Sequence, residues 1–166
     1  MRRVALLRGV NVGASTRVPM AHLRSMVEEL GGTDVVTYLN SGNVVFEGEL
    51  TGDLARRIHS ELGVSTKVVT VDAATLNEIV ADMPFTADDH AKLGVLFMRA
   101  VPKTIEAPAD LAPERLAVGK HAIYLDLPNG FGRSKLSPAW SKKHLPPEST
   151  ARNWRTVLKL RELLGG

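Results

Sequence analysis

The chain has 166 residues, of which 44% are hydrophobic, 23% are charged and none is cysteine. This balance is typical of one globular domain or two small ones and excludes a disordered chain, while the lack of cysteine excludes disulfides and thiolate chemistry. The net charge is +3, but residues 128–166 hold eight basic and two acidic residues. This +6 segment favours a basic face for an anionic partner, although solvated lysines on two helices explain it equally well.

Apolar runs along the chain stay far below the roughly 20 residues needed to cross a bilayer. The N-terminus offers only the apolar stretch 4–7 before Arg8. A secretory signal needs an apolar region of about 7–15 residues. We therefore expect a cytoplasmic protein without membrane contact.

The first half of the chain alternates between strand and helix patterns. It predicts a strand at 4–8, a helix at 20–30, strands at 35–39 and 44–47, a helix at 54–62 and a strand at 66–71. Helical spacing of apolar residues, Pro19 in a first turn and glycines after the apolar runs mark the helices. Residues 40–43 have the composition of a hairpin turn. This β-α-β-β-α-β order is typical of ferredoxin-like domains.

The second half repeats the same order after a connecting helix that follows Asp72 and stops at Pro84. It predicts a strand at 93–99, a proline-bounded helix at 102–107, a hairpin of 115–118 and 122–127, a helix at 134–144 interrupted by Pro138, and a strand at 149–152. A final amphipathic helix follows, with Asn153 as its N-cap. We therefore predict an α+β protein with two ferredoxin-like subdomains, residues 1–71 and 72–166, plus a C-terminal helix.

Three segments rich in Gly, Asn and Arg lie where apolar runs meet loops or helix starts: LLRGVNVG (6–13), YLNSGNVVF (38–46) and STARNWRTVLKL (149–160). Together and in this order they resemble the bacterial domain-of-unknown-function family 1697. The resemblance runs through nearly the whole chain. It implies a fold of two ferredoxin-like subdomains and a site at these motifs, in a family without an established activity.

The first motif offers groups that suit an anionic or polar ligand. Arg8 is a bidentate donor, Asn11 can donate or accept, and glycines such as Gly13 permit close backbone approach. The motif lacks the third glycine of a dinucleotide-binding fingerprint. In the alternative interpretation the glycines shape a strand-to-helix connection and Arg8 pairs with a carboxylate.

The turn at 40–43 contributes Ser41 and Asn43 as candidate ligand-binding residues. A nucleophilic Ser41 needs an adjacent base, and no His or Lys lies near it in the sequence. Asn and Ser side chains that bond the turn's own backbone also explain this composition.

Two basic segments complete the candidate site. Arg133 and Lys135 lie in a glycine loop before a helix, where free N–H groups and the helix dipole suit phosphate, although the loop is not a Walker A motif. Arg152 and Asn153 lie in the last motif, where the final helix begins. The sequence leaves open whether Trp154 stacks a base or docks the final helix on the core.

The five histidines lack metal-ligand spacing, so we expect no metal and no cofactor. We infer an anionic ligand, either nucleic acid or a phosphorylated small molecule, bound in a cleft between the subdomains. The alternatives are a metal-independent enzyme acting on a phosphorylated or nucleotide-like substrate, and a scaffold whose basic face meets an acidic protein. No general base can be matched to a nucleophile, so the sequence decides neither enzymatic activity nor oligomeric state.

Overall fold

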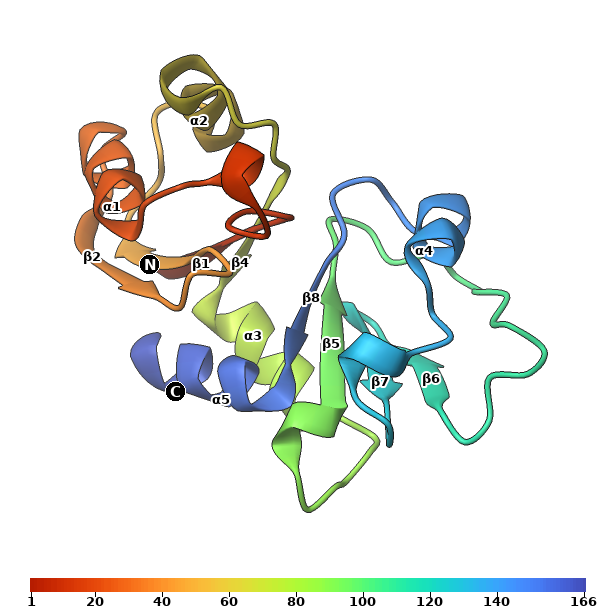
Figure 1. The fold of residues 1–166 in the computed structure, drawn as a ribbon. Helices are drawn as coiled ribbons and strands as arrows, with labels where there is room; N and C mark the ends of the chain where they lie inside the picture. Colours follow the sequence, from red (N-terminus) through yellow and green to blue (C-terminus); the bar gives the residue numbers. More distant parts are fainter. The chain divides into compact units, whose positions relative to one another are not determined.

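The computed structural model describes every residue from Met1 to Gly166 (Figure 1). The chain divides into two compact units, one of Met1–Ala74 with Leu160–Gly166 and one of Thr75–Lys159. Each unit contains one four-stranded antiparallel sheet. The protein is therefore of the α+β class with two subdomains, as the sequence predicts.

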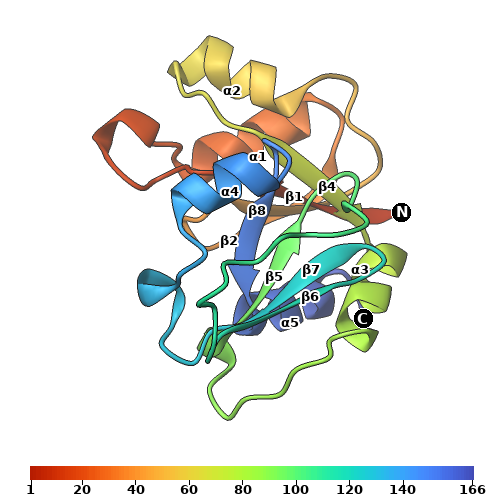
Figure 2. The same cartoon turned by 90° about the vertical axis from the view of Figure 1, so that its right-hand side faces the viewer.

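The first unit has the predicted element order, with boundaries within two residues of those expected. Its elements are β1 (Arg2–Leu7), η1 (Ala14–Thr16), α1 (Met20–Glu29), β2 (Thr33–Tyr38), β3 (Asn43–Glu47), α2 (Leu54–Leu62) and β4 (Val68–Asp72). The strand order is β2-β3-β1-β4, so β1 and β3 are central. The helices α1 and α2 lie side by side on one face of this sheet (Figures 1 and 2).

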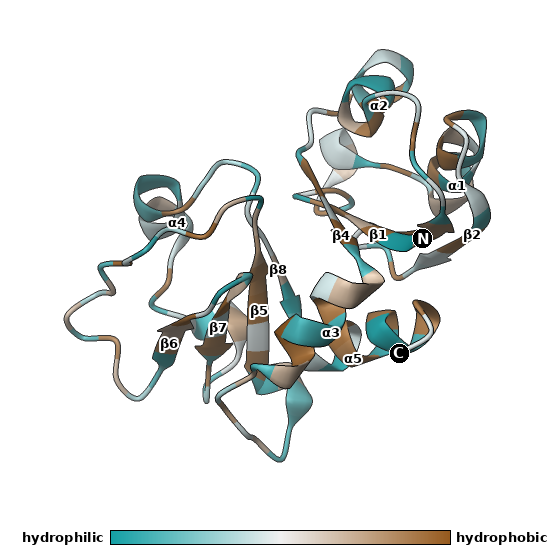
Figure 3. Cartoon of the chain, turned by 180° about the vertical axis from the view of Figure 1, so that it is seen from behind, coloured by the Kyte–Doolittle hydropathy of each residue, from teal (hydrophilic) through white to brown (hydrophobic).

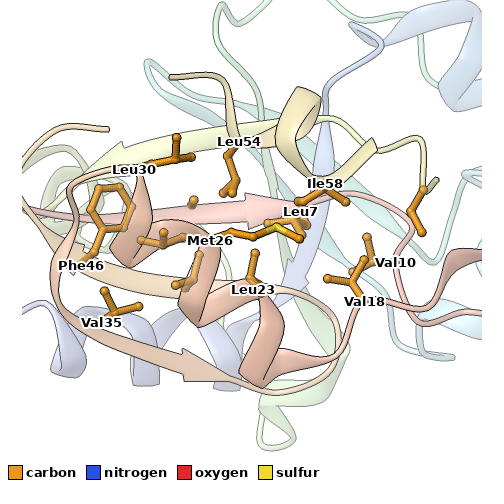
Figure 4. Close-up of a cluster of buried hydrophobic side chains, with 14 residues drawn as sticks. Leu7, Val10, Val18, Leu23, Met26, Leu30, Val35, Phe46, Leu54 and Ile58 are labelled. Carbon is orange, nitrogen blue, oxygen red and sulfur yellow. The ribbon is translucent and has the colours of Figure 1, made fainter. Parts of the chain in front are cut away.

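The core of the first unit lies between this sheet and its two helices. Figure 4 shows Leu23 and Met26 of α1 and Ile58 of α2 gathered against Leu7 of β1. All four side chains are almost fully buried. Burial of each such side chain contributes about 1.5–3 kcal/mol to the stability of the fold. The apolar residues at helical spacing in the sequence therefore form the faces of α1 and α2 that pack on the core.

The second unit is built from the elements that follow β4. They are α3 (Ala73–Ala81), η2 (His90–Lys92), β5 (Leu93–Phe97), β6 (Arg115–Val118), β7 (Ala122–Asp126), η3 (Phe131–Arg133), α4 (Pro138–His144), β8 (Thr150–Asn153) and α5 (Trp154–Leu163). The strand order is β6-β7-β5-β8. The hydropathy colouring of Figure 3 shows apolar residues along β5 and β7, at the middle of the sheet. Helix α4 lies on one face of this sheet, and α3 and the start of α5 lie on the other (Figures 1 and 3).

The expected helix at 102–107 is wrong, because the chain from β5 to β6 forms no helix. Pro102 and Pro108 leave too few residues for a stable helix, and the second proline disfavours helical backbone in the residue before it. Val101 and Ile105 nevertheless pack against the buried residues on the face of the second sheet that α4 covers. The apolar residues thus fill the place of a helix without forming one.

The expected helix at 134–144 begins later than predicted, at Pro138. The side chain of Ser137 accepts a hydrogen bond from the backbone N–H of Trp140 (3.2 Å) and caps the helix. Proline at the first helical position lacks an N–H that would be unsatisfied there anyway. Pro138 therefore starts α4 and does not interrupt it.

Tyr124 joins β7 to α3 on the opposite face of the second sheet. Its buried hydroxyl donates a hydrogen bond to the carbonyl of Ile79 (2.7 Å). Burial, with a smaller contribution from the negative charge of Asp82, raises the pKa of this phenol to about 12. The phenol is thus held in its protonated form.

Tyr124→Phe should lower stability by about 1 kcal/mol at neutral pH, through the lost hydrogen bond. The phenol pKa is about 10 in the unfolded chain, so between pH 10 and 12 only the unfolded chain releases this proton. The stability of the wild type should therefore fall as pH rises through this window, and the stability of the Phe variant should fall less. Urea unfolding at several pH values compares the two slopes, and parallel slopes would contradict the argument.

Candidate functional site

Three loops of the first unit meet at one end of its sheet. Strands β1 and β2 end there and β3 and β4 begin there, so loops 8–19, 39–42 and 63–67 form what we call the loop end. The N–H of Leu7 donates to the carbonyl of Gly42 (2.9 Å), and that of Arg8 to the carbonyl of Lys67 (3.0 Å). Antiparallel pairing thus brings the first two sequence motifs together.

The side-chain amide of Asn11 links loop 8–19 to the β2–β3 turn at this end of the sheet. Its Nδ2 donates to the carbonyls of Val18 (2.9 Å) and Asn40 (2.7 Å), and its Oδ1 accepts from the N–H of Val18 (2.9 Å). Its φ of 55° is one that asparagine tolerates better than most residues. The amide of Asn11 is therefore engaged within the protein and holds loop 8–19 against the turn.

Arg8 and Gly13 occupy different positions in the same loop. Arg8 is half-buried at the end of β1, and its carbonyl accepts a hydrogen bond from Oγ1 of Thr66 (2.8 Å). Gly13 is exposed and its φ of 174° is ordinary extended backbone. The carbonyl of Gly13 accepts from the N–H of Thr16 (3.2 Å) and closes the short helix η1.

Ser41 and Asn43 bond to each other within the hairpin turn. Nδ2 of the fully buried Asn43 donates to the carbonyl of Tyr38 (2.7 Å) and to Oγ of Ser41 (3.0 Å). These contacts hold the β2–β3 turn in shape. They are the local bonds expected of Asn and Ser in a tight turn.

The loop end is positively charged and free of acids. Its loops contain Arg8, Arg17 and Lys67 and no Asp or Glu. Arg17 and Lys67 are exposed and form no ion pair. The opposite end of the sheet carries acidic residues: Asp34, Glu47, Glu49, Asp53 and Asp72. Arg2, Arg3 and the N-terminal ammonium also lie at that opposite end, so it is the acids of this unit that are segregated, away from the loop end.

The nearest acid in sequence, Glu61 at the end of α2, is occupied by other partners. It bonds to the guanidinium of Arg57 and to Nε2 of His22 (2.8 Å). These hydrogen bonds, that of Arg57 first, hold the pKa of Glu61 below its usual range. Arg3 and Arg24 likewise pair with Glu49 (2.9 Å) and Glu28 (3.0 Å). Arg17 and Lys67 at the loop end form no such ion pair and therefore differ from these three arginines.

In the second unit, Lys135 is held by the protein and Arg133 is not. The ammonium of Lys135 donates to the carbonyls of Asp110 and Ala112, the latter at 3.0 Å. The backbone N–H of Lys135 donates to the buried carboxylate of Glu114 (2.8 Å), which also accepts a hydrogen bond from Oγ of Ser134 (2.6 Å). Arg133 lies exposed in η3 without an acidic partner.

Glu114 was missed by sequence analysis. An acid after a proline in a loop is ordinarily solvated, so no local signal marked it as a buried anchor for the loop at 134–135. No group of His, Asp and Glu side chains in the structure could hold a metal ion.

The third motif is largely buried. Arg152 is 6% exposed, and its guanidinium donates to Oγ1 of Thr150 (2.7 Å) and to the carbonyl of Ala151 (2.9 Å). Burial lowers its pKa to about 10, which still leaves it charged at neutral pH. Asn153 caps α5 by accepting from the N–H of Thr156 (2.9 Å), as predicted. Trp154 is buried, which answers the question left by the sequence in favour of the core.

The model of the DUF1697 family, described as a protein of unknown function, matches residues 1–124. The chain belongs to this family. The first two motifs, which form the loop end, lie within the matched range, and the resemblance noted from the motifs is confirmed.

The structure of a conserved bacterial protein from Streptococcus pneumoniae is similar, with a TM-score of 0.69 and 23% sequence identity. The similarity covers 99% of this chain and 98% of that one. At this identity the likeness concerns the fold alone. No curated protein matches the sequence. None of the five α-helices has the length and apolar character that crossing a membrane requires.

Proposed function

We propose that this protein binds single-stranded nucleic acid in the cytoplasm, through the phosphates, at the loop end of the first unit. The observation that carries the proposal is the segregation of charge. Met1–Ala74 holds eight basic and eight acidic residues, yet the loop end has three cations and no acid. A neutral unit with one cationic end presents a local positive potential to an anionic ligand.

The exposure of these cations favours a polymer over one small phosphorylated ligand. An exposed cation at 4 Å from a phosphate gains only about 1 kcal/mol in water, so useful affinity needs several contacts. A nucleic acid supplies phosphates in series and releases counterions at each contact. Arg133, Lys142 and Lys143 of the second unit are also exposed without acidic partners and add to this attraction.

We also infer that both sheets follow the ferredoxin-like plan, with a subdomain division near Asp72. The orders β2-β3-β1-β4 and β6-β7-β5-β8 are equivalent strand by strand, because in each sheet the first and third strands along the chain are central and the second and fourth lie at the edges. The second copy lacks only the helix after its first strand. Such a duplicated plan explains why the element order recurs along the chain.

Replacing both Arg17 and Lys67 by alanine should weaken binding of a labelled single-stranded RNA about tenfold at low salt. It should also reduce the slope of log affinity against log salt by about 1.4, since each phosphate contact on a single strand contributes about 0.7. Fluorescence anisotropy at several salt concentrations measures both quantities.

The matched control replaces Arg24 and Arg56, which are exposed on α1 and α2 and carry the same total charge. The control should bind nearly as wild type does. Equal losses in both double variants would mean that net charge and not the loop end attracts the RNA. Absence of wild-type binding at low salt would refute the proposed function.

A further inference from the structure

Two apolar side chains project from the loop end without contributing to the core. Val12 in loop 8–19 is 77% exposed, and Leu39 in the β2–β3 turn is 52% exposed. The two loops are tied together by the hydrogen bond from Nδ2 of Asn11 to the carbonyl of Asn40 (2.7 Å). The residues next to these bonded ones, Val12 and Leu39, are therefore held on neighbouring loops.

Leu39 also occupies an unfavourable backbone conformation. Its φ is 60°, in the left-handed region. The other non-glycine residues with positive φ are Asn11 and Asp34, whose types tolerate this region far better than leucine does. Leu39 is thus neither relaxed nor buried. The fold would gain from Asn or Gly at this position, and strain of this kind gathers at functional sites.

We infer that Leu39 and Val12 contact the bases of a bound single strand while Arg17 and Lys67 contact its phosphates. The inference rests on the proposed function and adds the part of the ligand that these residues recognise. Unpaired bases expose apolar faces that a duplex hides, and apolar side chains pack against or between them. Arg17 lies in the same loop as Val12, and the backbone carbonyl of Lys67 accepts from the N–H of Arg8 next to the end of β1. The cations and the apolar side chains thus all belong to the three loops of the loop end, which contain no acid.

The test compares two labelled probes of equal length, a single-stranded oligonucleotide and one with abasic sites at every second position. Wild type should bind the probe with all its bases more tightly. In Leu39→Asn with Val12→Ser, affinity for that probe should fall about fivefold, the equivalent of half a buried leucine side chain. Affinity for the abasic probe should change little, so that the preference between the probes narrows.

Stability provides a second readout, because Asn tolerates positive φ. The melting temperature of Leu39→Asn should equal or exceed that of wild type, which separates lost binding from lost folding. The control Val36→Ser changes a valine of β2 that is 40% exposed but lies within the strand, away from the loop end. It should keep the wild-type preference for bases.

The outcomes separate the inference from the function on which it rests. If wild type binds neither probe, the proposed function fails. If Arg17→Ala with Lys67→Ala weakens binding while Leu39→Asn with Val12→Ser retains the full preference for bases, the function stands and the inference is wrong. Loss of binding to phosphatidylglycerol vesicles in the apolar variant, with unchanged oligonucleotide binding, would also overturn it and assign the tips to a lipid surface.

Discussion

Gly42→Ala should destabilise the protein by roughly 3–5 kcal/mol, the largest effect we expect from a single methyl group in this chain. Gly42 has a φ of 90°, which an L-residue rarely adopts. A Cβ at this position would lie 2.7 Å from Cβ of Leu7 and 2.9 Å from Cγ2 of Val10. Both neighbours are buried and cannot move aside without disturbing the core of the first unit.

Gly9→Ala is the matched control for this prediction. Gly9 also has a positive φ, 66°, but a Cβ there would meet no atom within 4 Å. The stability lost in Gly9→Ala should therefore come only from the unfavourable backbone conformation, about 1–2 kcal/mol. Urea unfolding of the two variants separates backbone conformation from close packing. Equal losses would show that the approach of the turn to β1 is not as tight as the structure has it.

The sequence predicts the first unit almost completely, because each of its elements carries a redundant signal. Helix α2, for example, has an apolar face, a capping Asp53 whose side chain accepts from the N–H of Arg56 (3.1 Å), and a terminating Gly63 with φ of 67°. The helix expected at 102–107 had apolar residues but prolines at both limits. Prediction of secondary structure from the local sequence pattern thus fails where the chain packs apolar residues without forming regular backbone hydrogen bonds.

The candidate site was harder to predict, because polar residues in a glycine-rich loop motif can hold the fold together as well as bind a ligand. Asn11, Asn43 and Lys135 are engaged by carbonyl groups of their own unit. Sequence spacing cannot reveal these partners, some of which lie more than 20 residues away. Nor could it show that Leu39 is exposed with a positive φ, since leucine beside a hairpin is ordinarily counted as core. Assignment of ligand contacts therefore had to wait for the side-chain geometry.

Asn11→Ala should cost about 2–4 kcal/mol, because it removes three hydrogen bonds and places alanine at a φ of 55°. Asn11→Gly should cost less, since glycine adopts this φ freely and only the bonds are lost. Asn11→Asp should also be destabilising, because a carboxylate can still accept from the N–H of Val18 but cannot donate to the carbonyls of Val18 and Asn40.

Urea unfolding should therefore rank Asn11→Ala below Asn11→Gly, and both below wild type. Oligonucleotide binding of the folded variants, measured well below their unfolding midpoints, tests the alternative that Asn11 contacts the ligand directly. A side chain that contacts the ligand directly would weaken binding strongly in all three variants while leaving the unfolding free energy unchanged. That result would return Asn11 to the ligand-binding residues expected from its motif. The geometry predicts the reverse, a loss of stability that exceeds any loss of binding, because the whole amide of Asn11 is used to hold the loop that presents Val12 and Arg17.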